Sequence, residues 1–200
     1  PDWPLCYGMF FPTYTKISAI EGINYTYFQV FLEWIHRANA AFIVGPLALI
    51  IFFMINFRKD TSKDLKKLSI YLFILLSIQG LLGGLTVIKS NIPWSVAIHL
   101  SCAFLLFFVV LNMCLELINK KELVFKISPI TRTFILLSGL FTIITASAGA
   151  FTSKYGASLA CANWPNCNDN FFPDFSDMFE SIHFFHRTLV AILLFFLFIF

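Results

Sequence analysis

Five long apolar stretches constrain this 200-residue chain more than any other feature of its sequence. They run approximately over residues 28–57, 69–88, 94–118, 131–151 and 181–200. Each is as long as the ~20 residues that a helix needs to cross the hydrocarbon core of a bilayer. One compact core could not bury 26 phenylalanines, whereas lipid-facing helix surfaces accept them. The sequence therefore predicts an all-α integral membrane protein.

The lysines and arginines between these stretches predict which way each loop faces. Most of them fall in or beside residues 58–68 and 119–131, whereas the other three connections hold one lysine each. By the positive-inside rule the basic loops are cytoplasmic, and residues 1–25, 89–93 and 152–180 face outward. The net charge of +3 reflects this asymmetry and gives no support for binding to nucleic acid.

The two long outward segments repeat one another. Trp3-Pro4-Leu5-Cys6 and Phe10-Phe11-Pro12 match Trp164-Pro165-Asn166-Cys167 and Phe171-Phe172-Pro173 at a constant offset. A helix with a His-Arg pair follows each copy, at positions 36–37 and 186–187. Such a tandem repeat predicts a parallel duplication of one membrane unit.

The repeat also predicts the domain organisation. Residues 1–118 would form an N-terminal half-bundle, and residues 119–200 the start of a C-terminal one. A full protein would then have eight helices in two tandem four-helix bundles, about five of which are in this chain. One helix would precede Pro1 and two would follow Phe200, so we expect a truncated chain that is inactive by itself.

All four histidines lie where outward-facing ends of helices are expected. Imidazole within a membrane segment is costly and marks a functional site by default. Histidines on facing helices can bind a heme iron from both sides, which pairs His36 with His99, and His186 with a residue beyond Phe200. Zinc would need further ligands at the same centre. The alternative is interfacial histidines hydrogen-bonded to nearby carbonyl groups.

A carboxylate distinguishes the two halves. Glu33 stands three residues before His36, where the repeat has His183 before His186, and this spacing places each pair on one helical face. A carboxylate there can exchange protons during an oxidation, or it can simply pair with Arg37 or a lysine at headgroup level. Arg37 and Arg187 either bind heme propionates or anchor their helices at the interface.

Two cysteines bracket the Trp-Pro turn of the second copy. Cys161 and Cys167 lie on the outward side, where disulfides persist, and five intervening residues permit a bridge between them. Both a structural and a redox role are open, and a role in oxidation is slightly favoured. Cys6 matches Cys167, so the partner of Cys6 is expected just before Pro1.

Taken in order, these motifs resemble the Cys-containing bacterial heme A synthases. The resemblance covers almost the whole chain and rests on six segments: residues 1–6, 33–37, 79–87, 97–99, 161–167 and 183–187. It implies eight helices in two pseudo-symmetric halves, with a heme b cofactor in the C-terminal half. Heme O would bind in the N-terminal half, where its ring-D methyl group is oxidised to a formyl group through a hydroxymethyl intermediate, giving heme A for cytochrome oxidase.

The resemblance also implies a role for each site residue. Glu33 would be the catalytic carboxylate, His36 and His99 would bind the iron of heme O, and His186 would bind heme b (iron protoporphyrin IX). The resemblance also matches Cys161 with Cys167 as a disulfide, with the partner of Cys6 missing. From the residues themselves, His183, Arg37 and Arg187 are candidates for accessory groups. Heme O synthase, cytochrome oxidase assembly factors and a second copy of the chain are the partners considered, in a bacterial plasma membrane.

Two other functions fit parts of the pattern. A diheme b-type electron-transfer cytochrome would also use histidine pairs, but it needs neither Glu33 nor the duplicated cysteine loops. A transporter or heme chaperone would predict inverted repeats or broken helices near the midplane, whereas this repeat is parallel.

Overall fold

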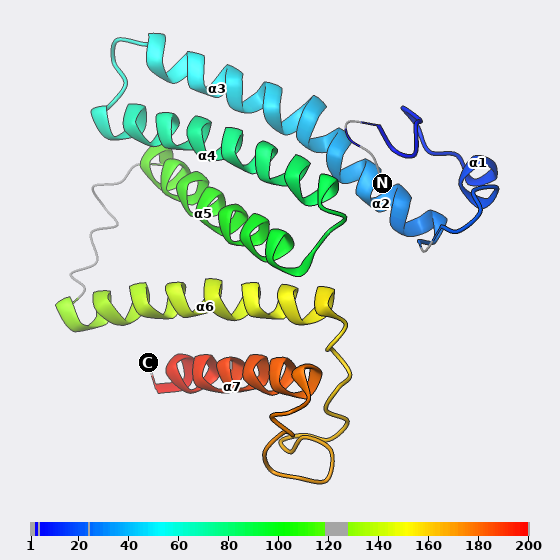
Figure 1. Ribbon diagram of the computed structural model, residues 1–200. Coiled ribbons are helices and arrows are strands. Elements are labelled where there is room, and N and C mark those ends of the chain that lie inside the picture. Colours follow the sequence, from blue (N-terminus) through cyan, green and yellow to red (C-terminus); the bar gives the residue numbers. More distant parts are fainter. Residues whose placement is uncertain (1–2, 4, 24, 119–127, 200) are drawn as a thin grey trace. The chain divides into compact units, whose positions relative to one another are not determined.

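The structure is a computed structural model that describes residues 3, 5–23, 25–118 and 128–199. These residues form helices joined by loops, with no strand among them. The elements are α1 (Tyr14–Ser18), α2 (Tyr27–Asn39), η1 (Ala40–Val44), α3 (Gly45–Phe57), α4 (Lys63–Ile88), α5 (Pro93–Ile118), α6 (Pro129–Tyr155) and α7 (Met178–Ile199) (Figure 1). Among these described residues, five spans are long and apolar enough to cross a membrane, which confirms an all-α integral membrane protein.

Helix starts differ from the predicted ones where polar residues open a helix. The stretch predicted from residue 69 begins at Lys63, because the Ser62 hydroxyl accepts the Leu65 N–H at 3.1 Å. Hydropathy detects the apolar part of such a helix and misses its charged first turns, so Lys63, Lys66 and Lys67 belong to α4 rather than to a loop. Likewise α6 begins at Pro129, after the capping residue Ser128.

The first predicted span is not a uniform α-helix. Tyr27–Phe57 is one continuous span, but it widens into a π-helical turn, η1, between α2 and α3. Pro46 has no N–H and its ring clashes with the carbonyl four residues back, and a wider turn relieves this conflict. The Gly45 N–H bonds to the Ala40 carbonyl, and a Cβ at position 45 would lie 3.2 Å from that oxygen.

The chain divides into two compact units, Pro1–Ser90 with Leu106–Asn119, and Asn91–Leu105 with Lys120–Phe200. In the first unit, α3 and α4 lie side by side (Figure 1). Their apolar core includes the buried residues Ala48, Ile55, Leu65, Leu72, Val109 and Met113. Within this core Asn56 donates to the fully buried Ser69 hydroxyl at 2.8 Å. The predicted division at residues 118/119 stays a prediction.

A smaller cluster in the first unit fixes the first cysteine loop, residues 5–12. Cys6, Ile17 and Val30 are its buried members, contributed by the loop, α1 and α2 in turn. Pro12 is also fully buried. The loop is thereby packed onto α2, the helix that carries Glu33, His36 and Arg37.

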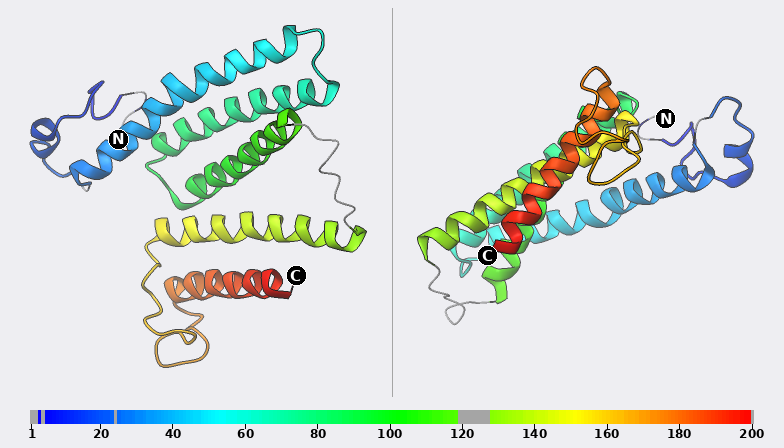
Figure 2. Two further views of the ribbon diagram at one scale, coloured as in Figure 1. Left: turned by 180° about the vertical axis from the view of Figure 1, so that it is seen from behind. Right: turned by 90° about the horizontal axis from the view of Figure 1, so that it is seen from below.

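The second unit is built on α6 and α7, which run antiparallel side by side in the views of Figures 1 and 2. The Phe196 ring contacts both Phe134 and Phe141 of α6. The first half of α5 joins this unit through a 2.7 Å hydrogen bond between the Ser101 and Ser147 hydroxyls. An open groove of about 470 Å³ is lined by Ala97, Ser147, Ala148, Phe151, Thr152, Ser181, Ile182 and Phe185.

Candidate functional site

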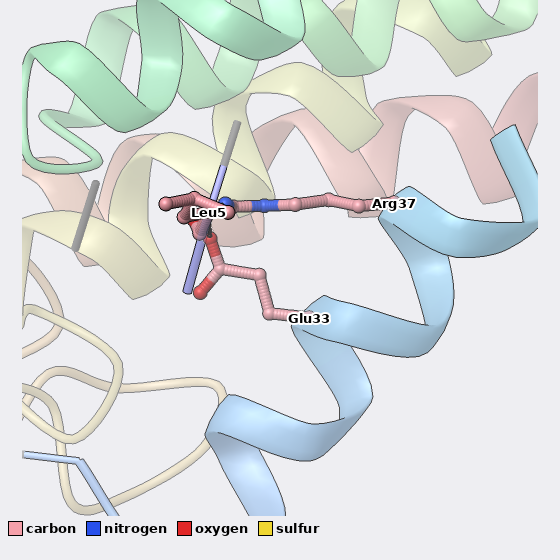
Figure 3. Close-up of polar contacts among 3 residues, drawn as sticks. All are labelled: Leu5, Glu33 and Arg37. Carbon is pink, nitrogen blue, oxygen red and sulfur yellow. Dashed lines mark hydrogen bonds and ion pairs between the residues drawn. The ribbon is translucent and has the colours of Figure 1, made fainter. Parts of the chain in front are cut away.

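The first cysteine loop and α2 meet at Arg37. Its guanidinium donates to the Leu5 carbonyl at 2.8 Å and forms an ion pair with the Glu33 carboxylate one turn earlier on α2 (Figure 3). The Arg37 side chain is 17% exposed and that of Glu33 33% exposed. The arginine thus ties the loop to the candidate catalytic carboxylate, and the ion pair considered as an alternative is the arrangement that forms.

A tryptophan strengthens this junction. The Trp34 indole N–H donates to the Phe10 carbonyl at 2.8 Å, and its ring meets Phe11 edge to face with centroids 4.7 Å apart. An aromatic side chain that also satisfies its N–H gives both burial and orientation. The loop therefore contacts α2 at two side chains, Trp34 and Arg37, which stand on either side of His36 in the sequence. His36 itself is exposed.

In the second unit, Arg187 of α7 holds the second cysteine loop, residues 161–173. It donates to the carbonyls of Cys161 at 2.8 Å and Asn166 at 3.2 Å, and also to that of Asn163. Its Nε donates to the His183 ring at 3.1 Å. Four of the five N–H groups of a guanidinium are thus used within the protein, which leaves little for a heme propionate.

His183 is committed to the same loop. It is 8% exposed, and its Nδ1 accepts the Cys161 backbone N–H at 3.1 Å, while Nε2 faces Arg187. A neutral imidazole has one acceptor nitrogen, so one of the two contacts is the hydrogen bond at any moment. In either state both nitrogens are turned to the loop and its arginine, and His183 orients the loop.

The predicted disulfide joins Cys161 and Cys167. Glu180, which the sequence analysis missed, organises the loop around it. Its carboxylate accepts from the Asn168 amide at 2.6 Å and the Asp174 backbone N–H at 2.9 Å, and lies 3.5 Å from the Cys167 sulfur. Hydrogen bonds from Ser176 in turn hold the pKa of Asp174 below its usual value. The position of Glu180, three residues before His183, was the available signal.

The sequence repeat is also a repeat of contacts. Cys6 and Met9 exchange backbone hydrogen bonds at 2.9 and 3.1 Å, and Cys167 and Asn170 do so at 2.9 and 3.2 Å. The residue after each cysteine has a positive φ, 53° at Tyr7 and 55° at Asn168. The arginine contact repeats at matching loop positions, Leu5 and Asn166.

We call each loop with its helix a module: the first module is residues 5–12 with α2, and the second module is residues 161–173 with α7. An aromatic pair recurs between loop and helix in both, as Phe11 with Trp34 and as Phe172 with Phe184. The two modules therefore share one architecture and differ in the partner of the arginine, which is Glu33 in the first and His183 in the second.

His186 is placed differently from His183. Its Nδ1 is buried and makes no normal hydrogen bond within the described part of the chain. The ring lies against Gly149 of α6 so closely that a Cβ there would stand 2.9 Å from its Cε1 and 3.2 Å from its Nε2. The absence of a side chain at Gly149 thus admits the imidazole.

The predicted pairing of His36 with His99 stays a prediction, because His36 belongs to the first unit and His99 to the second. His99 is half-buried on α5. Among the described residues there is no group of three or more His, Cys, Asp or Glu side chains that could hold a metal ion. A heme iron needs fewer protein ligands, because the protein supplies only one or two axial ligands.

Comparison with known proteins decides the family. Residues 1–200 match the model of the COX15-CtaA family, described as cytochrome oxidase assembly protein. The chain belongs to this family. It is similar to the heme A synthases of Exiguobacterium sibiricum, with 28% identity over 98% of this chain and 61% of the relative, and of Alkalihalophilus pseudofirmus, with 30% identity over 98% and 63%.

The heme A synthase of Pelagibacter ubique is 28% identical over 96% of this chain and 63% of the relative. The chain thus spans about three fifths of the length of these curated relatives. No solved structure matches it. Membership of the heme A synthase family confirms the resemblance drawn from the motifs.

Proposed function

We propose that the complete protein containing this chain is a heme A synthase, an oxidoreductase that converts the ring-D methyl group of heme O into a formyl group by way of a hydroxymethyl group. Conversion of a methyl to a formyl group removes four electrons and four protons and adds one oxygen atom from water or an equivalent donor. A site for this reaction needs a group that handles protons beside a bound porphyrin.

The observation that carries the proposal is the difference at one matched position of two modules that share an architecture. Both modules place a histidine beside the arginine that contacts the cysteine loop, at His36 and His186. The first module has the carboxylate of Glu33 where the second has the imidazole of His183. A permanent cofactor site has no use for a proton-transfer group, whereas a reacting site requires one.

His36 of the first module is proposed to bind the iron of heme O together with His99 of α5. The exposure of His36 leaves its ring accessible to a large flat ligand. Glu33 lies one turn before it on α2, where its carboxylate would receive protons released from the methyl carbon and stabilise positive charge that develops there. The loop contact of Arg37 would keep this carboxylate beneath the cysteine loop.

In the second module, His186 is proposed to bind heme b, which when bound supplies a one-electron redox centre. The residues fit this role because Gly149, which has no side chain, makes room for the His186 ring. His183 and Arg187 hold the disulfide loop beside it. A diheme electron carrier remains the rival function, and the proposed sidedness, with cysteine loops outside, belongs to the same proposal.

Pigment analysis tests the proposal. The complete gene product would be expressed with a heme O synthase in a host without its own heme A synthase. The extracted hemes would be separated by chromatography and identified by mass spectrometry. Heme A or its hydroxymethyl precursor, absent with His36→Ala, supports the synthase. Recovery of unmodified heme O and heme B alone would favour the electron carrier.

A further inference from the structure

The two arginines of the modules differ in how exchangeable their partners are. Arg187 is bonded to three carbonyl groups and His183, all of them parts of the folded loop and its helix. Arg37 instead pairs with the carboxylate of Glu33, besides donating to the Leu5 carbonyl. An arginine that holds a neighbouring carboxylate can pass to another carboxylate without opening the loop, whereas Arg187 cannot.

We propose that Arg37 recognises a carboxylate of the porphyrin substrate, and that its transfer from Glu33 to this carboxylate frees Glu33 to act in the reaction. The inference rests on the proposed function and adds to it the group that recognises the substrate and the event that prepares the site. Heme O carries two propionate carboxylates, which guanidinium groups bind in bidentate geometry.

The charges favour such an exchange. In the ligand-free chain Glu33 and Arg37 neutralise each other (Figure 3). An incoming propionate brings a further negative charge, and one arginine cannot fully pair with two carboxylates. When Arg37 passes to the propionate, that pair becomes neutral and Glu33 keeps its charge, close to the carbon from which protons must leave. The exposure of the Glu33 side chain, 33%, lets the pair open without a change of the core.

The exchange gives the site a selectivity that shape alone does not supply. A porphyrin with free propionates would release Glu33, whereas the same porphyrin with esterified propionates would leave Glu33 paired. The contact between Arg37 and the Leu5 carbonyl remains in place throughout, so the guanidinium turns about a fixed anchor. Arg37 is in this sense a positioning residue for Glu33 and a binding residue for the substrate.

The test measures binding of heme O and of its dimethyl ester to the purified holoenzyme by absorbance titration. Glu33→Gln removes the internal competitor of the propionate, so heme O should bind about two- to fivefold more tightly, the equivalent of one exposed ion pair. Affinity for the ester should not change. Arg37→Gln should abolish the preference for heme O over the ester and cancel the gain from Glu33→Gln.

Two variants control for charge and folding. Lys89→Gln removes an exposed cation of the same unit and should leave the preference unchanged. Arg37→Lys keeps the charge and should retain part of the preference. The heme b spectrum of the second module reports whether each variant is folded.

Three results would overturn the proposal: no gain with Glu33→Gln, a preference for heme O that survives Arg37→Gln, or no binding of heme O. The first two, in an enzyme that still forms heme A, refute the exchange and leave the proposed function intact. Absence of heme A formation by the unaltered enzyme refutes the function itself.

Discussion

The first and second modules attach a cysteine loop to a helix in the same way but differ in the side chain that the arginine contacts. In each, a cysteine loop is fixed to a membrane helix by an arginine that follows a histidine, and the loops turn at equivalent residues, Tyr7 and Asn168. In the first module the arginine ends on Glu33, and in the second it ends on His183 and the disulfide loop. Glu33 and His183 occupy equivalent positions in the two modules, and we propose that this exchange separates the reacting site from the site of permanent binding.

Removing the two histidines of α7 one at a time tests the comparison with the largest expected effect. His186→Ala should eliminate the b-type heme of the second module, because His186 is the proposed ligand of its iron. His183→Ala should retain that heme and loosen the loop instead. Absorbance of the reduced protein measures both. Equal heme loss in the two variants would show that the assignment of His186 is wrong.

The packing of His186 can be tested from the opposite helix. Gly149→Ala places a Cβ 2.9 Å from the imidazole, and overpacking of this kind costs about 1–3 kcal/mol. Heme b occupancy should therefore fall about tenfold or more. Gly139→Ala is the matched control on α6, since nothing lies within 4 Å of a Cβ there. Similar spectra for both variants would contradict the contact.

These contacts show what could and could not be predicted from the sequence. Hydropathy predicted the five spans, and the repeat predicted the matching loops. The spacing of Cys161 and Cys167 permitted a bridge, and the family resemblance implied it. The π-helical turn was not predicted, because it arises from the local steric conflict at Pro46, and hydropathy averaged over many residues does not detect such a conflict. The commitment of Arg187 to carbonyl groups also escaped prediction, because backbone acceptors leave no trace in residue types.

The disulfide of the second loop is expected to have a smaller effect, on stability. Replacing Cys161 and Cys167 together by serine should lower the free energy of unfolding by about 2 kcal/mol, the loop-closure value for so short a loop. Cys114→Ser, at an exposed position, is the control. Denaturant titration of detergent-solubilised protein measures the effect. A double variant as stable as the control would mean that Glu180 and Arg187 alone secure the loop.

The smallest expected effects concern the first turns of the two module helices. Thr26 caps α2 through a reciprocal pair of hydrogen bonds with Gln29, and Asp177 accepts the Phe179 N–H at 2.7 Å before α7. Replacing either by alanine should cost about 1 kcal/mol of stability. Thr15→Ala on the exposed face of α1 serves as the control. Thermal unfolding measures both variants. Widely different losses of stability for Thr26→Ala and Asp177→Ala would contradict the equivalence of the modules.

The central claim is that the module with the carboxylate is the reacting one, and heme analysis of two glutamate variants tests it most directly. Glu33→Gln and the exposed Glu21→Gln would be expressed in the complete protein with a heme O synthase, and the heme A formed would be quantified by chromatography. We predict a loss of at least about a hundredfold with Glu33→Gln, as expected for a general acid or base, with heme b still bound, and full yield with Glu21→Gln. Undiminished heme A from Glu33→Gln would contradict the account.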